Sequence, residues 1–412
     1  MPSRREIWQP PVRPEWVQRI NEEGAGLDLK GVVPLDPESL LATATRNTGL
    51  NDFGANDWRE PFERFCQALD DEAELNLMGR IMTRSELLMY LEARLRVEEL
   101  YRSHPEIDEQ EIAAPVWILG QGRTGTSMLQ TLMALPPENR TLTIREAFFP
   151  VDTAAHHAEA DHRIGLWNRV TPEVATIHDF EGPEAIETIM IETLSFQQPA
   201  WMNLMGMTPG FTHWVATTRD MRPALAYGKR VLKAIQWQNP GRQWILKSPD
   251  AIRYIPDVLA IFPDVRFVWA HRDPVVTLSS AVNMIGTLTW VRSDRKLGEG
   301  IFDAITDPDA AAQSMTQPIA WIDDGTIPPG QIVHVMYDDL VKDPIAAIAG
   351  IYRDLGMDFS QAARDAIATH LAAHPRGSRK PHRYAIGEED RIARERQAFA
   401  RYEEYFKVPR DF

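Results

Sequence analysis

The sequence predicts an α/β fold, a parallel sheet flanked by helices, with an N-terminal helical extension. Three observations predict it. From about residue 115 onward the chain has short, nearly continuous apolar runs, as expected for parallel strands covered on both faces. Segments with helical spacing of apolar residues lie between these runs, and helical patterns fill the first 110 residues. We therefore expect an extension over residues 1–111 and a catalytic α/β domain over residues 112–412.

Length and composition limit the class of protein. A chain of 412 residues is long enough for one large domain with an extension. The single cysteine, Cys66, excludes an internal disulfide framework and fits a cytoplasmic location, and no apolar run is long enough to predict a membrane span. The net charge of −15 argues against nucleic acid as a partner. An anionic ligand would therefore need a locally basic site.

The N-terminal extension is predicted to be helical along most of its length. Asp36 and Pro37 are typical of a helix start, and Gly49 is typical of a stop. A second helix is expected over about residues 57–69, and an amphipathic third over about residues 83–103. Nothing in these segments is arranged for chemistry, so we interpret them as packing elements.

Four apolar runs predict the strands of the sheet: residues 116–119, 244–246, 266–270 and 332–336. The second and third runs are separated by one helix-length segment, residues 252–262. Such a strand–helix–strand unit implies a right-handed parallel crossover. The long stretch 150–240 is predicted to be mainly helices and loops.

A glycine-rich loop, residues 120–127, directly follows the first predicted strand. The segment after it has helical spacing and ends at Pro136. Glycines allow backbone N–H groups to turn inward around an anion, and the N-terminus of the following helix adds positive potential. Strand, glycine loop and helix in this order predict a phosphate-binding loop, and hence a P-loop-type sheet.

The loop departs from the ATP-binding version in ways that bear on its ligand. Gly120 and Gly125 have the ATP-binding spacing, but Thr126 stands where lysine is expected, and the cation is Arg123 inside the loop. No strand ends in the aspartate that would hold Mg²⁺ on a triphosphate. The loop therefore favours a phosphate-bearing donor without a metal. A magnesium-dependent small-molecule kinase remains the alternative.

A second basic element follows the third predicted strand. Arg272 stands at the strand end, Pro274 opens the next helix, and Ser280 lies about 10 Å further along it. A long arginine and a seryl hydroxyl at this separation can reach one phosphate. The alternative is a buried ion pair with a helix cap.

Taken together, these motifs resemble those of the PAPS-dependent sulfotransferases, whose donor is 3′-phosphoadenosine 5′-phosphosulfate. The similarity is strongest to the large bacterial branch of that family. It rests on residues 115–127, 244–249, 272–280 and 337–344, which occur in the expected order. The resemblance implies an enzyme that uses PAPS as co-substrate, needs no metal, and sulfates a hydroxyl of a small organic acceptor.

The resemblance also implies roles for individual residues. The 5′-phosphosulfate would be held by the loop, namely Gly122, Arg123, Thr124, Gly125, Thr126 and Ser127. Arg272 and Ser280 would hold the 3′-phosphate, and Lys247 would join Arg123 in stabilising charge on the bridging oxygen. Arg379 and Lys380 belong to a basic stretch similar to the loop that closes over the 3′-phosphate in the family. A solvated basic loop is the alternative for this stretch.

The catalytic base does not follow the family pattern. Pro249 and Ala251 occupy the two positions at which relatives place a histidine. Two substitutes remain, Glu146 and His178, and we prefer Glu146, because burial near its following phenylalanines should raise its pKa. The alternatives are an ion pair for Glu146 and a packing role for His178. A catalytically inactive nucleotide-binding protein also remains possible, and the sequence predicts neither the acceptor nor the oligomeric state.

Overall fold

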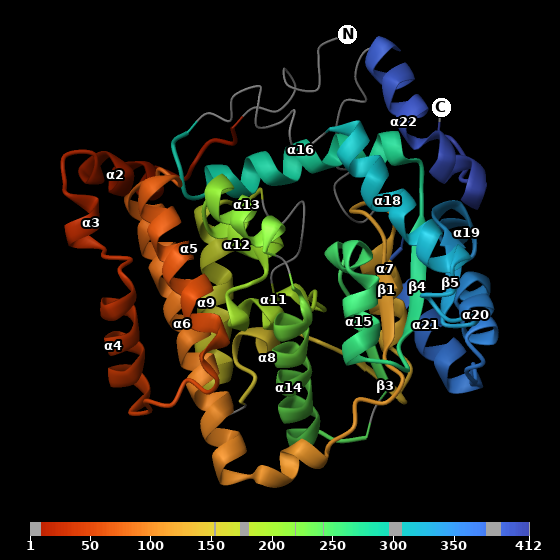
Figure 1. The fold of residues 1–412 in the computed structure, drawn as a ribbon, viewed down its shortest axis with the longest axis horizontal. Coiled ribbons are helices and arrows are strands. Elements are labelled where there is room, and N and C mark those ends of the chain that lie inside the picture. The colour runs from red at the N-terminus through yellow and green to blue at the C-terminus, as the bar shows by residue number, and fades with distance from the viewer. Residues whose placement is uncertain are drawn as a thin grey trace.

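The computed structural model describes residues 10–151, 154–173, 181–218, 220–241, 243–295, 307–375 and 389–411. A five-stranded parallel sheet has helices on both faces, and the N-terminal helices stand to one side of it (Figure 1). The strand order is β2-β3-β1-β4-β5, and every neighbouring pair is parallel. The predicted fold class is therefore confirmed.

The strands correspond closely to the apolar runs of the sequence. Their bounds are β1 Val116–Leu119, β2 Asn139–Thr141, β3 Gln243–Lys247, β4 Arg266–His271 and β5 Ile332–Met336. Sequence reasoning missed β2, because Asn-Arg-Thr is not an apolar run. It is an edge strand whose single partner among the described residues is β3. The crossover from β3 to β4 is parallel as predicted, but β1 lies between the two strands.

Side chains of the central strands alternate between two buried clusters. Val116 and Ile118 of β1 face a cluster that α7, α20 and α21 cover. Trp117 and Leu119 face the other cluster, to which α14 and α15 belong. The bounds of these helices are α7 Thr126–Ala134, α14 Arg222–Gln238, α15 Ile255–Ile261, α20 Pro344–Asp354 and α21 Gln361–Ala373. Burial on both faces explains the continuous apolar runs.

The N-terminal helices predicted over residues 36–49 and 57–69 lie within two residues of those bounds, whereas the helices over residues 15–24 and 29–32 were not predicted. Their bounds are α2 Glu15–Gly24, α3 Leu29–Val32, α4 Pro37–Thr48, α5 Arg59–Asp71 and α6 Leu77–Ser103. The Asp36 carboxylate caps α4 by accepting from the Ser39 N–H at 2.9 Å, and Gly49 ends that helix at φ 72°. Helix α6 begins six residues before the predicted residue 83, because Asn76 accepts from the Gly79 N–H at 2.8 Å and acts as its cap.

The extension and the sheet share one hydrophobic core. Phe62 and Leu91 of the N-terminal helices belong to the same buried cluster as Trp117 and Trp269 of the sheet. Within the described ranges, the buried apolar cluster is continuous from the N-terminal helices to the sheet. The division near residue 112 therefore stays a prediction.

The remaining helices lie partly beside the sheet and partly against the N-terminal helices (Figure 1). They are α8 Ile144–Phe148, α9 Ala154–Val170, α11 Ile189–Glu192, α12 Pro199–Met205, α13 Pro209–Thr217, α16 Pro274–Trp290, α18 Pro308–Asp323, α19 Tyr337–Lys342 and α22 Glu389–Phe406. The helix predicted over residues 252–262 is divided into a 3₁₀ turn, Asp250–Arg253, and α15. Pro256 starts the new helix, because proline fits a first turn and lacks the N–H that a continuous helix would need there. Among the described residues, no helix combines the length and apolar character that crossing a membrane requires.

Candidate active site

The glycine loop joins β1 to α7 and has the backbone of an anion-binding turn. Gly125 is the N-cap of α7 and has φ 88°, and a side chain there would approach a Leu340 methyl to 2.9 Å. Arg123 has φ 73°, which is a rarely populated conformation for a residue with a side chain. The Thr124 side chain is buried and its hydroxyl donates to the Gln121 carbonyl at 2.7 Å, whereas Arg123 and Ser127 are exposed. The tight turn therefore presents its cation and one hydroxyl outward.

Lys247, the last residue of β3, connects the loop to a carboxylate that the sequence analysis missed. Its side chain is only 2% exposed, and its Nζ donates to Ser127 Oγ at 3.1 Å. The same Nζ forms an ion pair with Glu187 Oε1 at 2.9 Å. Glu187 keeps 20% of its side chain exposed, so its carboxylate faces both the buried cation and solvent.

The two predicted basic elements meet directly. Arg272 Nη1 donates to the backbone carbonyl of Arg123 at 3.1 Å, so the residue after β4 touches the middle of the glycine loop. The Arg272 guanidinium also lies over the Tyr337 ring, 4.0 Å from its centroid. A second contact joins loop and helix: Thr277 Oγ1 of α16 donates to Gln121 Oε1 at 2.6 Å. These contacts bring the loop and the β4–α16 corner into one site.

Arg272 also contacts a residue near the C-terminal end of the described chain. Its Nε and Nη2 donate to Asp411 Oδ2 at 3.2 and 3.0 Å. The backbone N–H of Asp411 donates in turn to Asp273 Oδ2 at 2.9 Å. The guanidinium therefore holds an anionic oxygen in this structure, and that oxygen belongs to the protein.

Asp273 stabilises the β4–α16 corner from its buried side. It is fully buried, caps α16 by accepting from the Val275 N–H, and accepts two hydrogen bonds of 2.7 Å from Arg396 of α22. Burial alone would raise the pKa of Asp273, but the Arg396 guanidinium and the Asp411 N–H hold it below its ordinary value. The alternative interpretation of the Arg-Asp-Pro sequence, an ion pair with a helix cap, thus describes Asp273, while Arg272 keeps its guanidinium in the site.

Glu146 lies at the start of α8 and has several partners. Its Oε1 accepts from Arg140 Nη2 at 2.5 Å, which is the ion pair considered as the alternative. Its Oε2 accepts from the backbone N–H and hydroxyl of Thr143, both at 3.0 Å, in a capping box. Oε1 therefore joins α8 to β2 and Oε2 caps α8, and a role for Glu146 as base stays a prediction.

The other predicted site residues are placed only in part. Ser280 lies on α16 as expected, but its side chain is outside the described part of the structure. His178, Arg379 and Lys380 also lie outside the described residues. The described residues therefore bring together Arg123, Ser127, Lys247 and Arg272.

Glu187 and Asp411 could not have been identified from the sequence. Glu187 lies in the stretch 150–240, where no motif marks it, and its partner Lys247 is 60 positions further along the chain. Asp411 is 139 positions from Arg272. Only the folded chain brings these pairs into contact.

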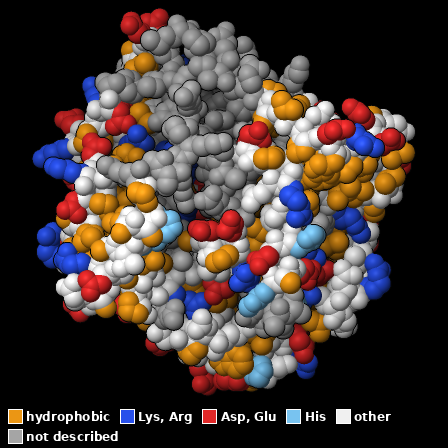
Figure 2. All heavy atoms as spheres, turned by 180° about the vertical axis from the view of Figure 1, so that it is seen from behind, with side chains coloured by type: hydrophobic (Ala, Val, Ile, Leu, Met, Phe, Trp, Pro, Cys, Tyr) orange, Lys and Arg blue, Asp and Glu red, His pale blue; other side chains and the backbone are white. Residues whose placement is uncertain are grey.

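The face of the molecule drawn in Figure 2 has no broad basic area on its described part. Figure 2 shows acidic and basic side chains interspersed on the described part of one face, with hydrophobic side chains gathered over the N-terminal helices at its upper right. The exposed large hydrophobic residues of α2, α3 and the segment between them include Trp16, Leu27 and Val32. Within the described ranges, no three His, Cys, Asp or Glu side chains are grouped as a metal site. Among the described residues, the cations at the candidate site are Arg123, Lys247 and Arg272.

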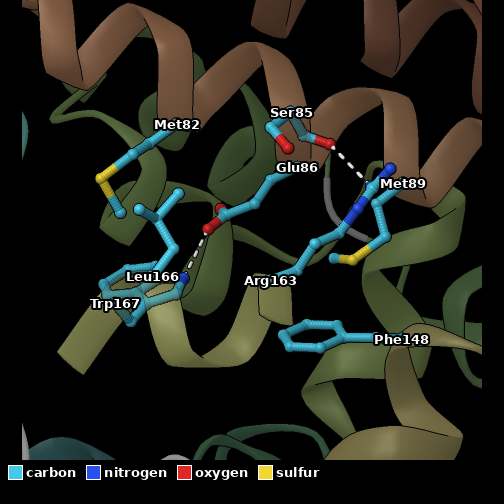
Figure 3. Close-up of a pocket in the computed structure, with 8 residues that line it drawn as sticks. All are labelled: Met82, Ser85, Glu86, Met89, Phe148, Arg163, Leu166 and Trp167. Carbon is cyan, nitrogen blue, oxygen red and sulfur yellow. Dashed lines mark hydrogen bonds between the residues drawn. The ribbon is translucent and has the colours of Figure 1, made fainter. Parts of the chain in front are cut away.

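A small, mostly apolar pocket lies between α6, α8 and α9 (Figure 3). Its lining residues are Met82, Ser85, Glu86, Met89, Phe148, Arg163, Leu166 and Trp167. Figure 3 shows the Trp167 indole donating to Glu86, at 2.7 Å, and Arg292 Nη2 donates to the same oxygen at 2.7 Å. The free space of about 30 Å³ is enough for one or two water molecules. In this conformation the pocket is too small for an organic acceptor.

Comparison with known proteins gives consistent results. The sequence model of the sulfotransferase family matches residues 115–361, which is more than half of the chain. The chain is 22% identical, over 289 residues, to the omega-hydroxy-beta-dihydromenaquinone-9 sulfotransferase Stf3 of Mycobacterium bovis and of Mycobacterium tuberculosis. The alignment covers 63% of this chain and 67% of each relative.

Two solved structures show the same fold. Sulfotransferase STF1 of Mycobacterium tuberculosis H37Rv superposes with a TM-score of 0.75 at 24% identity, covering 88% of this chain and 98% of that one. Sulfotransferase STF9 of Mycobacterium avium superposes with a TM-score of 0.74 at 22% identity, covering 91% and 97%. The coverage shows that the shared fold extends well beyond the matched residues 115–361.

Proposed function

Because the chain belongs to the sulfotransferase family, we propose that it transfers the sulfuryl group of PAPS to a hydroxyl of a small organic acceptor. The observation that supports PAPS as the donor is the contact between Arg272 Nη1 and the Arg123 carbonyl, at 3.1 Å. It joins an anion-binding loop to a second cation, as a donor with phosphate at both the 5′ and 3′ positions requires. The Asp411 carboxylate on Arg272 supports the same assignment, since it stands where a phosphate oxygen would bind.

The glycine loop and the residues at the strand ends would bind different parts of the donor. The backbone of residues 122–127, with Arg123 and Ser127, would bind the 5′-phosphosulfate, and Arg272 with Ser280 the 3′-phosphate. Lys247 would stabilise charge on the oxygen that bridges phosphorus and sulfur, because its Nζ already reaches Ser127. PAPS supplies an activated sulfuryl group, and the protein contributes in-line positioning and these cations.

Two carboxylates compete for the role of base that accepts the acceptor's proton. Glu146, the choice from the sequence, has both oxygens engaged by Arg140 and Thr143. Glu187 Oε1 lies 2.9 Å from Lys247 Nζ, and the Glu187 side chain remains partly exposed. We propose Glu187 as the base, because a donor that draws Lys247 toward its phosphosulfate would release this carboxylate beside the site of transfer. His178 remains the third candidate.

The acceptor is proposed only as a class. The mycobacterial relatives are named for sulfating an omega-hydroxylated dihydromenaquinone, a hydroxyl on a large apolar molecule. We propose a hydroxylated, predominantly apolar acceptor for this chain as well. A panel of long-chain alcohols, prenyl alcohols and simple phenols, with sugars as the contrast, would test this class with PAPS as donor.

Donor binding is tested by thermal unfolding with PAP, the product nucleotide. PAP at 100 times its dissociation constant should stabilise the folded protein by about 2.7 kcal/mol, because it binds only the native state. An Arg272→Ala variant should lose most of this stabilisation. Stabilisation by ATP with Mg²⁺ in place of PAP, and activity lost on adding EDTA, would contradict the donor assignment and favour a kinase.

The base is tested by comparing Glu187→Gln with Glu146→Gln, using an acceptor from the panel. Glu187→Gln should lower kcat by about 10²- to 10⁴-fold, the usual size of general-base catalysis, while leaving PAP binding intact. Glu146→Gln should change stability more than the pH–rate profile, since it weakens the cap of α8. A Glu187→Gln enzyme that transfers sulfate at the parent rate would rule out this assignment.

A further inference from the structure

We propose that Asp411 is a built-in competitor for the 3′-phosphate of the donor, and that it weakens the hold of the enzyme on 3′-phosphorylated nucleotides. The inference rests on the proposed function, because it takes Arg272 as the 3′-phosphate ligand. It adds a residue that determines donor affinity, located near the C-terminal end of the described chain.

The contact occupies one edge of the guanidinium. Arg272 Nε and Nη2 both point to Asp411 Oδ2, at 3.2 and 3.0 Å. Arginine binds phosphate best through two such parallel N–H groups. The remaining donor, Nη1, is turned to the Arg123 carbonyl at 3.1 Å. A phosphate that uses the paired edge must therefore displace or share the place of this carboxylate.

The position of Asp411 is built into the fold. Its backbone N–H donates to Asp273 Oδ2 at 2.9 Å, and Asp273 is fully buried and held by Arg396 of α22. A second set of ion pairs fixes the same segment: Glu403 accepts from Arg396 at 2.7 Å and from Arg410 at 2.6 Å. The backbone at residue 411 is thus anchored at the β4–α16 corner, with its carboxylate aimed at Arg272.

The side chain is free to leave, even though its backbone is anchored. Asp411 is 25% exposed and Arg272 is 16% exposed, so the ion pair is partly accessible to water. Partly exposed ion pairs contribute little free energy, and a phosphate with two negative charges competes well against one carboxylate. Binding of the donor is therefore feasible but weakened, and release of the product PAP is favoured.

The test compares two ligands that differ only in the 3′-phosphate, PAP and 5′-AMP, on the parent protein and on Asp411→Ala and Asp411→Asn. Both substitutions keep the backbone N–H that bonds Asp273. Isothermal titration should show PAP bound about threefold to tenfold more tightly by the variants, as expected for removal of one partly exposed competing ion pair. Affinity for 5′-AMP should stay within about twofold of the parent value.

Matched controls separate this effect from general electrostatics. Glu404→Gln removes one negative charge from an exposed position on α22 and should leave PAP affinity unchanged. Asp411→Glu keeps a carboxylate at this position, so it should bind PAP more weakly than Asp411→Ala and Asp411→Asn do. The apo melting temperature of each variant shows whether it is folded.

Three outcomes would overturn the inference. PAP affinity that is unchanged or weaker in both Asp411→Ala and Asp411→Asn would show that Asp411 does not compete. An equal gain for 5′-AMP would show that the effect does not involve the 3′-phosphate. If parent and variants all fail to bind PAP, the donor assignment falls and the inference falls with it, which distinguishes this failure from the first two.

Discussion

Glu192 is a fully buried carboxyl group on α11, next to Gly228 of α14. Its Oε2 accepts hydrogen bonds from Gln198 Nε2 at 2.8 Å and from Tyr254 OH at 3.4 Å. Burial raises the pKa of Glu192 to about 7, against hydrogen bonds that lower it. The folded protein therefore keeps a proton on this residue over a pH range in which the unfolded chain has lost it.

This shift predicts a pH-dependent stability. Because the folded pKa is above the unfolded value, the stabilisation is complete below about pH 4.5 and is lost as pH rises through about 7. The whole change is on the order of 3 kcal/mol. Denaturant unfolding should show that the isosteric variant Glu192→Gln, which cannot ionise, gains stability relative to the parent as pH rises from 5 to 8. The exposed control, Glu404→Gln, should keep the pH dependence of stability that the parent shows. If Glu192→Gln also kept it, the prediction would be contradicted.

Sequence reasoning found those site residues that follow a strand. Arg123, Lys247 and Arg272 each come directly after an apolar run or within the loop behind one, so their place at the sheet edge could be predicted. Glu187 and Asp411 could not be, because each reaches its partner only through tertiary contacts. The sequence also did not identify Arg140 as the ion-pair partner of Glu146, because Arg140 lies on β2, which was not predicted.

At the scale of elements, α6 packs against the end of α16 through a glycine. A methyl group on Gly79 would clash with the Arg292 carbonyl oxygen, so a side chain there must displace the segment that follows α16. The same Arg292 donates to Thr83 Oγ1 at 2.9 Å and to Glu86 Oε1 at 2.7 Å, both on α6. The close approach therefore supports a buried ion pair between the elements.

We predict that Gly79→Ala lowers the free energy of unfolding by about 2–4 kcal/mol, because the clash is with backbone and cannot be relieved by rotating a side chain. Chemical denaturation measures this directly. Gly350→Ala is the matched control: it is also inside a helix, and the nearest atom to its new methyl is the end of Arg353, at 3.9 Å. That substitution should stabilise the protein by about 0.5–1 kcal/mol through helix propensity. Equal effects at the two positions would contradict the packing argument.

The elements that sequence reasoning predicted well are those with strong local signals. Helix α4 has an aspartate cap, a proline in its first turn and a glycine stop, and its bounds were predicted to the residue. Strand β2 has no such signal and exists because its backbone pairs with β3. The early start of α6 depends on a single cap, Asn76, placed before a glycine that the helix pattern does not favour.

At the scale of the whole molecule, a buried histidine ties the sheet to the C-terminal helix. His271, at the end of β4, forms hydrogen bonds with Tyr402 of α22 at 2.7 Å and with His334 of β5 at 2.9 Å. Burial, and next the neighbouring His334, hold the pKa of His271 well below its ordinary value. The unfolded chain would bind a proton here near pH 6.5, whereas the folded chain would not.

This group opposes Glu192 across the same pH range. A depressed folded pKa means that stabilisation is present above about pH 6.5 and is lost as pH falls. Between pH 5 and pH 6.5, the changes in stability that Glu192 and His271 cause should partly cancel in the parent protein. Because desolvation also lowers the pKa of His334, to about 4, His271→Gln should remove only part of this effect, and it should lose less stability than the parent as pH falls from 7 to 5. Unfolding curves at several pH values measure this, and a variant that follows the parent throughout would contradict the prediction.

The single core shared by the N-terminal helices and the sheet has a consequence for cooperativity. Since Phe62 and Leu91 are buried in one cluster with Trp117 and Trp269, neither part can melt without exposing apolar surface of the other. Calorimetry should accordingly record one heat-absorption peak, and the sheet expressed without the first 111 residues should aggregate. In this chain, the cooperative unfolding unit therefore includes the N-terminal helices as well as the sheet that carries the candidate active site.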